Sequence, residues 1–317
     1  MARKHRPPPL PASPLMPQPT VDLDNDVLTA RLPSGDSVTV YLYGATVTSW
    51  KTSTGQEQLF LSTAAILNGT KPIRGGVPLV FPNFGPPVKD HTTGQLPQHG
   101  FARNSTWEFL GKSSSESTSN DSVKLDFGLG PQQLDESVRS KWNYDFGLVY
   151  SVSLSKDKLQ LSLLVKNEGT TPFEFHALFH TYLAIKDISK TTVSGLANTH
   201  YVDKVRGGKT FQEDSQQLAI TAETDRVYAL PVASSVNQDA AVVVKEAGNP
   251  TFVVTRDALP NVVVWNAWED KVKAMADFEP NDGWKRYLCI EPGTVLNWTR
   301  LEGGDAWTGS TTFEAKL

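Results

Sequence analysis

The sequence predicts an all-β protein, and more closely a large antiparallel β-sandwich with few short helices. Short runs of β-branched and aromatic residues recur along the 317-residue chain, and glycine or proline usually lies between them. Helical periodicity is nearly absent. Many strands with hardly any helix favour antiparallel sheets packed face to face over alternating strand and helix units. We expect one domain of this kind over residues 21–317, a length that can bury a large hydrophobic core.

The predicted elements follow one another at short intervals. Strands are expected over 38–43, 47–50, 59–61, 123–127, 148–154, 159–165, 173–183, 241–244, 252–254, 262–265, 287–290 and 295–301. The best helical pattern covers residues 131–142, where a proline suits the first turn and Leu134 and Val138 lie four residues apart. Residues 111–121 are polar and rich in serine, and we expect a loop there.

Residues 1–20 differ from the rest of the chain. They are rich in proline, contain the basic residues Arg3, Lys4 and Arg6, and have no acidic residue. Such a segment buries too little apolar surface to offset the entropy lost on ordering, so we expect a disordered tail. A transit peptide is the alternative, although the prolines oppose the amphipathic helix that such peptides form.

The composition limits the function. A net charge of −4 gives no overall positive field for nucleic acid or an anionic membrane surface, and we expect neither as a partner. No run reaches the roughly 18 consecutive apolar residues of a membrane span. The single cysteine, Cys289, cannot form an internal disulfide, which fits a reducing compartment, and we expect a cytoplasmic protein. A monomer is also expected.

Residues 173–183, which read FEFHALFHTYL, carry the first chemical signal. In a strand the phenylalanines fall on one face, whereas Glu174, His176, His180 and Tyr182 fall on the other. An exposed face usually carries threonine, serine and lysine, so a row with two imidazoles and a carboxylate indicates a functional site. His180 is our candidate for the group that supplies a proton. His176 could equally be a supporting residue without substrate contact, and the two histidines could also bind a metal.

A second informative region is the loop-rich block 71–103. It combines glycines and prolines with two arginines, Arg74 and Arg103, and with the pair Gln98-His99. A covering loop with surface ion pairs would look similar. Beside a histidine row, a binding loop is the better interpretation.

The third region, residues 262–291, combines aromatic residues with a glutamate. Trp265 and Trp268 could stack on a carbohydrate or belong to the aromatic core, and contact between Trp268 and a substrate stays open. Glu291 ends an alternating run, and the following Pro292-Gly293 is expected to stop the strand. A glutamate held rigidly at such a strand end can act as a general base.

Common cofactor and metal motifs are not supported. Residues 206–210 end like a phosphate-binding loop, but Asp203 stands where the first glycine is needed. His176 and His180 have the spacing of zinc-protease ligands, but Ala177 occupies the position of the catalytic glutamate. No Gly-x-Ser-x-Gly element of a serine hydrolase occurs. We expect neither a metal nor a cofactor.

Several of these segments together resemble the aldose 1-epimerase superfamily and, within it, the glucose-6-phosphate 1-epimerases, also called hexose-6-phosphate mutarotases. The similar motifs occur in order, within roughly residues 27–312, at 72–78 (PIRGGVP), 96–103 (LPQHGFAR), 178–183 (LFHTYL), 224–228 (TDRVY), 265–266 (WN), 275–278 (MADF) and 289–293 (CIEPG). The resemblance implies a galactose mutarotase-like supersandwich with its active site on a concave sheet face. One departure is Ala267, where a proline is common in the family.

The resemblance also implies roles for individual residues. His180 would be the general acid and Glu291 the general base. The implied substrate-binding residues are Arg74, Gln98, Arg103 and Asp225, with His99 beside them. The implied activity is the interconversion of the α and β anomers of D-glucose 6-phosphate, and of related hexose 6-phosphates.

These residue types suit that chemistry. A base takes the proton of the C1 hydroxyl while an acid protonates the ring oxygen, and the ring opens and recloses on the other face. Near neutrality we expect Glu291 ionised and His180 protonated, with the carboxylate raising the pKa of the histidine further. The two arginines can each present a planar fork to phosphate, and Asp225 can accept hydrogen bonds from sugar hydroxyls.

Two other functions stay open from the sequence. The protein could be a mutarotase for unphosphorylated aldoses, or a non-catalytic binder of sugar phosphates. The preferred hexose 6-phosphate is not determined either.

Overall fold

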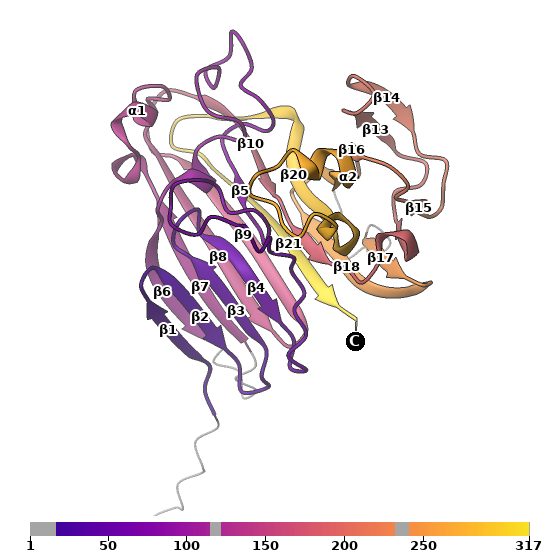
Figure 1. Cartoon of the computed structure of the whole chain (residues 1–317). Coiled ribbons are helices and arrows are strands. Elements are labelled where there is room, and N and C mark those ends of the chain that lie inside the picture. Colours follow the sequence, from indigo (N-terminus) through magenta and orange to yellow (C-terminus); the bar gives the residue numbers. More distant parts are fainter. Residues whose placement is uncertain (1–16, 115–121, 232–240, 317) are drawn as a thin grey trace, which may run out of the picture.

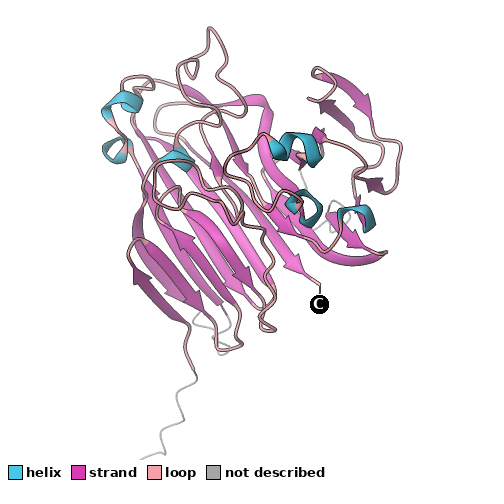
Figure 2. Cartoon of the chain, in the orientation of Figure 1, coloured by secondary structure: helices cyan, strands magenta, loops and turns pink. Residues whose placement is uncertain are grey.

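The computed structural model describes residues 17–114, 122–231 and 241–316, and it confirms the all-β prediction. The described strands form three antiparallel sheets, and the helices among them are short (Figures 1 and 2). None of the described helices is long and apolar enough to cross a membrane.

The smallest sheet has four strands. They are β1 (Thr20–Asp24), β2 (Val27–Arg31), β3 (Ser37–Tyr41) and β4 (Thr46–Lys51). Their order in space is the order of the sequence, so this sheet is a simple meander.

The largest sheet has nine strands. They are β6 (Glu108–Ser114), β7 (Ser122–Leu129), β8 (Phe146–Ser155), β9 (Lys158–Asn167), β12 (Thr191–Ser194), β15 (Leu218–Ala219), β17 (Val242–Glu246), β18 (Asn249–Asp257) and β21 (Ala306–Ala315). Their order is β15-β12-β17-β18-β21-β9-β8-β7-β6, so the C-terminal strand β21 joins the two halves of the sheet.

The third sheet has eight strands and carries the candidate site. They are β5 (Leu79–Val80), β10 (Phe173–Phe179), β11 (Tyr182–Ala184), β13 (His200–Asp203), β14 (Lys209–Gln212), β16 (Thr224–Ala229), β19 (Asn261–Asn266) and β20 (Tyr287–Leu301). The order is β14-β13-β16-β19-β20-β10-β5, and β11 also pairs with β20.

The described helical segments cover loops at the sheet ends. They are α1 (Glu136–Arg139), α2 (Trp268–Lys273) and the 3-10 turns Ala102–Asn104, Pro131–Gln133, Ile188–Lys190 and Gly283–Arg286.

The core lies between the nine-stranded sheet and the other two. In β8 and β9 buried apolar residues alternate with more exposed ones, as a half-buried strand requires. Aromatic rings join the sheets across this core. Trp50 of β4 and Phe252 of β18 have ring centroids 6.5 Å apart, and Tyr150 of β8 and Phe179 of β10 have centroids 6.1 Å apart. One face of each smaller sheet is therefore used for packing.

Two predicted strands differ from the structure at the candidate site. The strand expected over 173–183 is interrupted, because β10 ends at Phe179 and β11 begins at Tyr182. The strand expected to stop after Glu291 continues through Pro292 to Leu301. The break between β10 and β11 lies opposite this part of β20, which pairs with β11 up to Cys289 and with β10 only from residue 293. A proline, which lacks a backbone N–H, is tolerated where pairing is interrupted.

Other predictions were wrong in detail. Residues 131–142 form a 3-10 turn and the one-turn helix α1 rather than one helix, because Leu134 between them is extended and buries its side chain. Residues 59–61 form only isolated bridges. Residues 111–114 of the predicted loop belong to β6, and 115–121 lie outside the described residues. Residues 1–16 of the predicted tail also lie outside them, and Thr20 already belongs to β1.

A tight backbone contact joins the block 71–103 to the four-stranded sheet. Gly76 has a φ of +64°, and a Cβ atom there would lie 2.1 Å from the backbone oxygen of Val47 in β4. The N–H of Val77 donates to the same oxygen at 2.8 Å. Only glycine fits both the left-handed backbone and the close approach. This contact fixes the chain directly after Arg74.

We predict that Gly76→Ala lowers the free energy of unfolding by about 2–5 kcal/mol. A left-handed alanine costs roughly 1–2 kcal/mol, and an overpacked contact adds roughly 1–3 kcal/mol. Gly55→Ala is the matched control, because Gly55 has a φ of +81° but nothing lies within 4 Å of its Cβ position. Urea unfolding of the two variants measures the difference, and equal losses would contradict the steric explanation.

Candidate functional site

All seven residues that the sequence analysis names as a site line one cavity of about 560 Å³. They are Arg74, Gln98, His99, Arg103, His180, Asp225 and Glu291. Strands β16, β19 and β20 form the floor of the cavity, and the block 71–103 forms a wall. The structure therefore brings the predicted residues together, and their individual roles stay a prediction.

His180 and Glu291 are in direct contact at the cavity floor. Nδ1 of His180 lies 3.2 Å from Oε1 of Glu291, and the two side chains are only 11% and 1% exposed. No hydrogen-bond partner of this Oε1 is found among the described residues. The thiol of Cys289 lies beneath the pair, with Sγ 3.9 Å from the same Nδ1. The pair is thus buried, adjacent and incompletely hydrogen-bonded.

The strand break positions the imidazole. His180 lies between β10 and β11, and its backbone N–H donates to the carbonyl of Pro78 at 3.0 Å. The ring of Tyr182 stacks on the imidazole, with centroids 4.9 Å apart and planes at 11°. Trp265 meets the imidazole edge-on at 5.6 Å. Packing on two sides therefore leaves the ring little rotational freedom.

Burial shifts the pKa values of the two groups in opposite directions. Burial, together with the positive charges of Arg103 and Arg74, holds the pKa of His180 well below its usual value. Burial and the charge of Asp225 hold the pKa of Glu291 well above its usual value. The free site therefore favours a neutral glutamic acid beside a neutral imidazole. The expectation that Glu291 raises the pKa of His180 is wrong for the free site, because burial and the arginines outweigh the carboxylate.

The two arginines differ in what holds them. Nη2 of Arg74 lies 3.2 Å from Oδ2 of Asp277, and its Nη1 donates to the hydroxyl of Tyr182 at 3.4 Å. Arg103 donates from Nη2 to the carbonyl of Gln98 at 2.9 Å, and no partner of its buried Nε is found among the described residues. Burial lowers the pKa of Arg103 to about 10, so the guanidinium stays charged at neutral pH. Arg103 therefore keeps a donor free for an anion.

Two neutral histidines hold the adjacent loop. The N–H groups of Phe84 and Gly85 donate to the Nδ1 atoms of His176 and His99, at 3.3 and 3.2 Å. Each imidazole must therefore carry its hydrogen on Nε2. Burial lowers the pKa of both histidines, to about 4 in His176, which keeps them neutral. Nε2 of His99 also lies 3.3 Å from the side-chain nitrogen of Gln98, and with the hydrogen on Nε2 these groups form a hydrogen bond only when the Gln98 amide presents its oxygen instead. His99 lines the cavity, whereas His176 supports the loop from behind.

Of the two tryptophans in the motif, only one lines the cavity. Trp265 lines the cavity, whereas Trp268 packs on Trp284 with ring centroids 4.4 Å apart and is not among the cavity residues. The sequence motif therefore contributes one wall residue and one packing residue.

The structure adds cavity residues that the sequence analysis missed, among them Phe84, Lys204 and Lys271. Lys204 directly follows β13, with Nζ 3.9 Å from Oδ1 of Asp225 and 3.6 Å from the ring centroid of Phe84. Nothing in the local sequence distinguishes it from the nearby Arg206 and Lys209.

One group of side chains among the described residues could hold a metal ion. Ligand atoms of His180, Cys289 and Glu291 lie within 4.8 Å of one another. The charges of Arg103 and Arg74 act on the same site and oppose a second cation. The arrangement therefore favours proton transfer over metal binding.

Comparison with known proteins agrees with this geometry. A family model described as aldose 1-epimerase matches residues 26–314. A protein named "Putative glucose-6-phosphate 1-epimerase" from Cenchrus ciliaris is 36% identical over 281 residues, which are 87% of this chain and 80% of that protein. A protein of the same name from Escherichia coli is 34% identical over 250 residues, which are 79% of this chain and 77% of that protein.

The fold is also similar to solved structures. The crystal structure titled as a "putative mutarotase" from Salmonella typhimurium matches with a TM-score of 0.79 at 27% identity, over 96% of this chain and 95% of that chain. A galactose 1-epimerase from Lactobacillus acidophilus matches with a TM-score of 0.66 at 12% identity, over 94% and 98% of the chains, and this likeness concerns the fold alone. By the family match over most of its length and by these relatives, the chain belongs to the aldose 1-epimerase family.

Proposed function

We propose that the protein is an isomerase that interconverts the α and β anomers of D-glucose 6-phosphate and of related hexose 6-phosphates. The observation that carries the proposal is the buried contact between His180 and Glu291 in a cavity that also holds Arg103. The two oxygens that must exchange protons, O1 and O5, are both bonded to C1. An acid and a base that touch each other can therefore serve both oxygens. The names of the relatives from Cenchrus ciliaris and Escherichia coli support the same reaction.

The strand order orients the sugar in this proposal. His180 lies on one side of β20, in the break between β10 and β11, whereas Asp225 lies two strands away on the other side, in β16. Neighbouring strands are about 4.8 Å apart, so the backbones of β16 and β20 lie roughly 10 Å apart, and the side chains of Asp225 and Glu291 can reach a sugar ring from both. With O1 at Glu291 and O5 at His180, carbons C2 and C3 extend toward Asp225. The C6 phosphate, on the O5 side, extends toward Arg103, whose charge acts on His180.

The pair shares one proton throughout the reaction. The carboxylate of Glu291 takes the proton of the C1 hydroxyl, the imidazolium of His180 protonates O5, and the C1–O5 bond breaks. The open-chain aldehyde then faces a neutral glutamic acid and a neutral imidazole. After rotation about the C1–C2 bond, the same transfers run backwards and close the ring on the other face.

The substrate phosphate assists this cycle by its charge. The free site favours the neutral pair, but ring opening needs the carboxylate of Glu291 and the imidazolium of His180. A proton must therefore move from Glu291 to His180 before the ring opens. Nδ1 and Oε1 are 3.2 Å apart, so a small rotation of either side chain aligns the hydrogen bond that this transfer needs. A phosphate dianion beside Arg103 and Arg74 offsets the charges that lower the pKa of His180, and the imidazolium becomes more accessible.

Further properties follow as proposals. The single described cysteine, Cys289, is buried and unpaired, which supports a reducing compartment such as the cytoplasm. The substrate is a small molecule that fits a cavity of about 560 Å³. The expectation of a monomer stays a prediction.

Glu291→Gln and His180→Asn each lower the enzymatic exchange of glucose 6-phosphate anomers by at least about 10²–10⁴-fold, because each removes one proton-transfer group. NMR exchange spectroscopy measures the rate above that of buffer. Glu174→Gln is the matched control, because Glu174 lies in β10 outside the cavity and is 40% exposed. Full exchange in a folded Glu291→Gln variant would refute the assignment.

Arg103→Ala separates phosphorylated from free sugars. Loss of charge-assisted hydrogen bonds to phosphate should lower kcat/KM for glucose 6-phosphate by roughly 10–100-fold or more. Any turnover of free glucose or galactose should not fall, because neither sugar carries the phosphate and loss of the Arg103 charge makes His180 easier to protonate. The same exchange measurement on all three sugars decides the point, and an equal loss on glucose would favour a mutarotase of unphosphorylated aldoses.

The protonation of His180 is testable directly. In the free protein its imidazole should be neutral at about pH 6, where an ordinary histidine with a pKa of about 6.5 is mostly protonated, because its pKa is lowered. Adding 1,5-anhydroglucitol 6-phosphate, which cannot open its ring, should raise this pKa, whereas unphosphorylated 1,5-anhydroglucitol should not. Nitrogen-15 NMR of labelled histidine, assigned with His180→Asn, reports both states. A protonated His180 in the free protein at that pH would contradict the argument.

A further inference from the structure

One cation in the cavity, Lys204, is not accounted for by the proposed reaction. The pairing of β13 with β16 explains its place. Asp203 is opposite Arg226 in this pair, and one step further the N–H of Lys204 donates to the carbonyl of Asp225 at 2.9 Å. Side chains alternate between the two faces of a sheet. The pair Asp203–Arg226 therefore lies on one face, and the pair Lys204–Asp225 lies on the cavity face.

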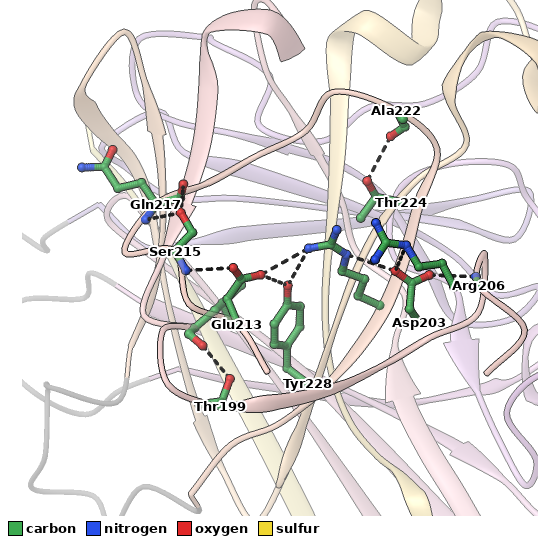
Figure 3. Close-up of polar contacts among 11 residues, drawn as sticks. Thr199, Asp203, Arg206, Glu213, Ser215, Gln217, Ala222, Thr224 and Tyr228 are labelled. Atoms are coloured by element: carbon green, nitrogen blue, oxygen red, sulfur yellow. Dashed lines mark hydrogen bonds and ion pairs between the residues drawn. The ribbon is translucent and has the colours of Figure 1, made fainter. Parts of the chain in front are cut away.

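The opposite face carries a network that holds this backbone in place (Figure 3). Arg226 joins two buried acids, with Nε 3.5 Å from Oδ2 of Asp203 and Nη1 3.2 Å from Oε2 of Glu213. The hydroxyl of Tyr228 donates to the same Glu213 oxygen at 2.9 Å. These contacts tie β13, β16 and the segment after β14 together directly behind Lys204.

Contacts hold the ammonium group of Lys204 in place, but its N–H donors are not used in hydrogen bonds within the described part of the chain. It lies over the ring of Phe84 and near Asp225, and neither contact is a hydrogen bond. No hydrogen bond of Nζ is found among the described residues, so three N–H donors remain for a ligand. The other cavity lysine differs, because Lys271 donates to Glu223 at 2.8 Å.

The position of Lys204 relative to the acid-base pair indicates which part of the sugar it meets. Asp225 lies across β19 from Cys289, two residues before Glu291 in β20, and on the side of β20 away from His180. In the proposed orientation this side receives C2 and C3. Adjacent sugar hydroxyls both donate and accept hydrogen bonds, and a carboxylate beside an ammonium offers one acceptor and one donor at that spacing.

We propose that Lys204, paired with Asp225, binds the adjacent C2 and C3 hydroxyls of the hexose 6-phosphate and makes the enzyme specific for sugars that carry both. This proposal rests on the proposed function for the orientation of the sugar. It adds a substrate-contacting residue on the side opposite the phosphate site.

The test asks whether the loss of the Lys204 side chain and the loss of one sugar hydroxyl have the same effect or independent effects. Lys204→Met removes the ammonium and keeps the length of the side chain. Lys209→Met is the matched control, because Lys209 is an exposed lysine at the start of β14 in the same hairpin. The kcat/KM of anomer exchange is measured by NMR on glucose 6-phosphate and on its 2-deoxy, 3-deoxy and 4-deoxy analogues.

Lys204→Met should lower kcat/KM for glucose 6-phosphate by roughly tenfold or more, mainly through KM, whereas Lys209→Met leaves it unchanged. With the 2-deoxy or the 3-deoxy analogue the effect of Lys204→Met should largely disappear, since the hydroxyl that it binds is gone. With the 4-deoxy analogue, the fold-loss in kcat/KM caused by Lys204→Met and the fold-loss caused by removing the C4 hydroxyl should multiply. A purely structural role would give multiplied losses on every analogue, and that result overturns the proposal.

A binding measurement tests the role of Lys204 without relying on the proposed reaction. Calorimetric titration with 1,5-anhydroglucitol 6-phosphate, which keeps the C2 and C3 hydroxyls but has no anomeric centre, should show roughly tenfold weaker binding to Lys204→Met than to Lys209→Met. Absence of anomer exchange in the unmodified protein would refute the proposed function and leave this comparison in force. Equal binding by the two variants refutes the role of Lys204.

Discussion

The contact between His180 and Glu291 is the constraint on which the rest of the site depends. In the proposed mechanism these two groups exchange one proton and act on two oxygens of the same carbon, and the break between β10 and β11 lets them touch beside an unbroken β20. Burial gives the contact a cost, because it disfavours both charged forms. In the proposed mechanism, the charge that makes the ion pair accessible therefore comes from the phosphate of the substrate.

The charges of the free cavity are separated, and those nearest the pair favour its neutral form. Arg74 and Arg103 act on His180, whereas Asp225 acts on Glu291 and is paired with Lys204. In a chain of net charge −4, this local concentration of cations attracts an anionic substrate that the protein as a whole would repel. In the proposed binding mode this polarity also orients the sugar, with its phosphate on one side of the acid-base pair and its hydroxyls on the other.

The sequence was sufficient to predict those features of the structure that depend on a local residue pattern. Strands such as β8 and β9 follow from alternation, and the site residues follow from short motifs whose members lie within a few positions of one another. Lys204 could not be predicted, because its place in the cavity depends on the register between β13 and β16, a long-range property. The predicted protonation state of His180 was wrong for a similar reason. The sequence indicates a carboxylate partner, but neither the burial of the pair nor the arginines that face it.

Unpartnered polar groups explain how such a cavity can bind tightly. Oε1 of Glu291 and Nε of Arg103 are buried, and no hydrogen bond of either atom is found among the described residues. A buried polar group without a hydrogen bond costs a folded protein about 1–3 kcal/mol. A hexose 6-phosphate carries the complementary groups, since a hydroxyl donates to the carboxylate and phosphate oxygens accept from the guanidinium. In the proposed function, a substrate that meets these groups after a small side-chain movement restores the missing bonds, and the recovered free energy contributes to affinity. Arg74 lacks this role to the extent that Asp277 already satisfies it, so its guanidinium serves chiefly as a fixed charge.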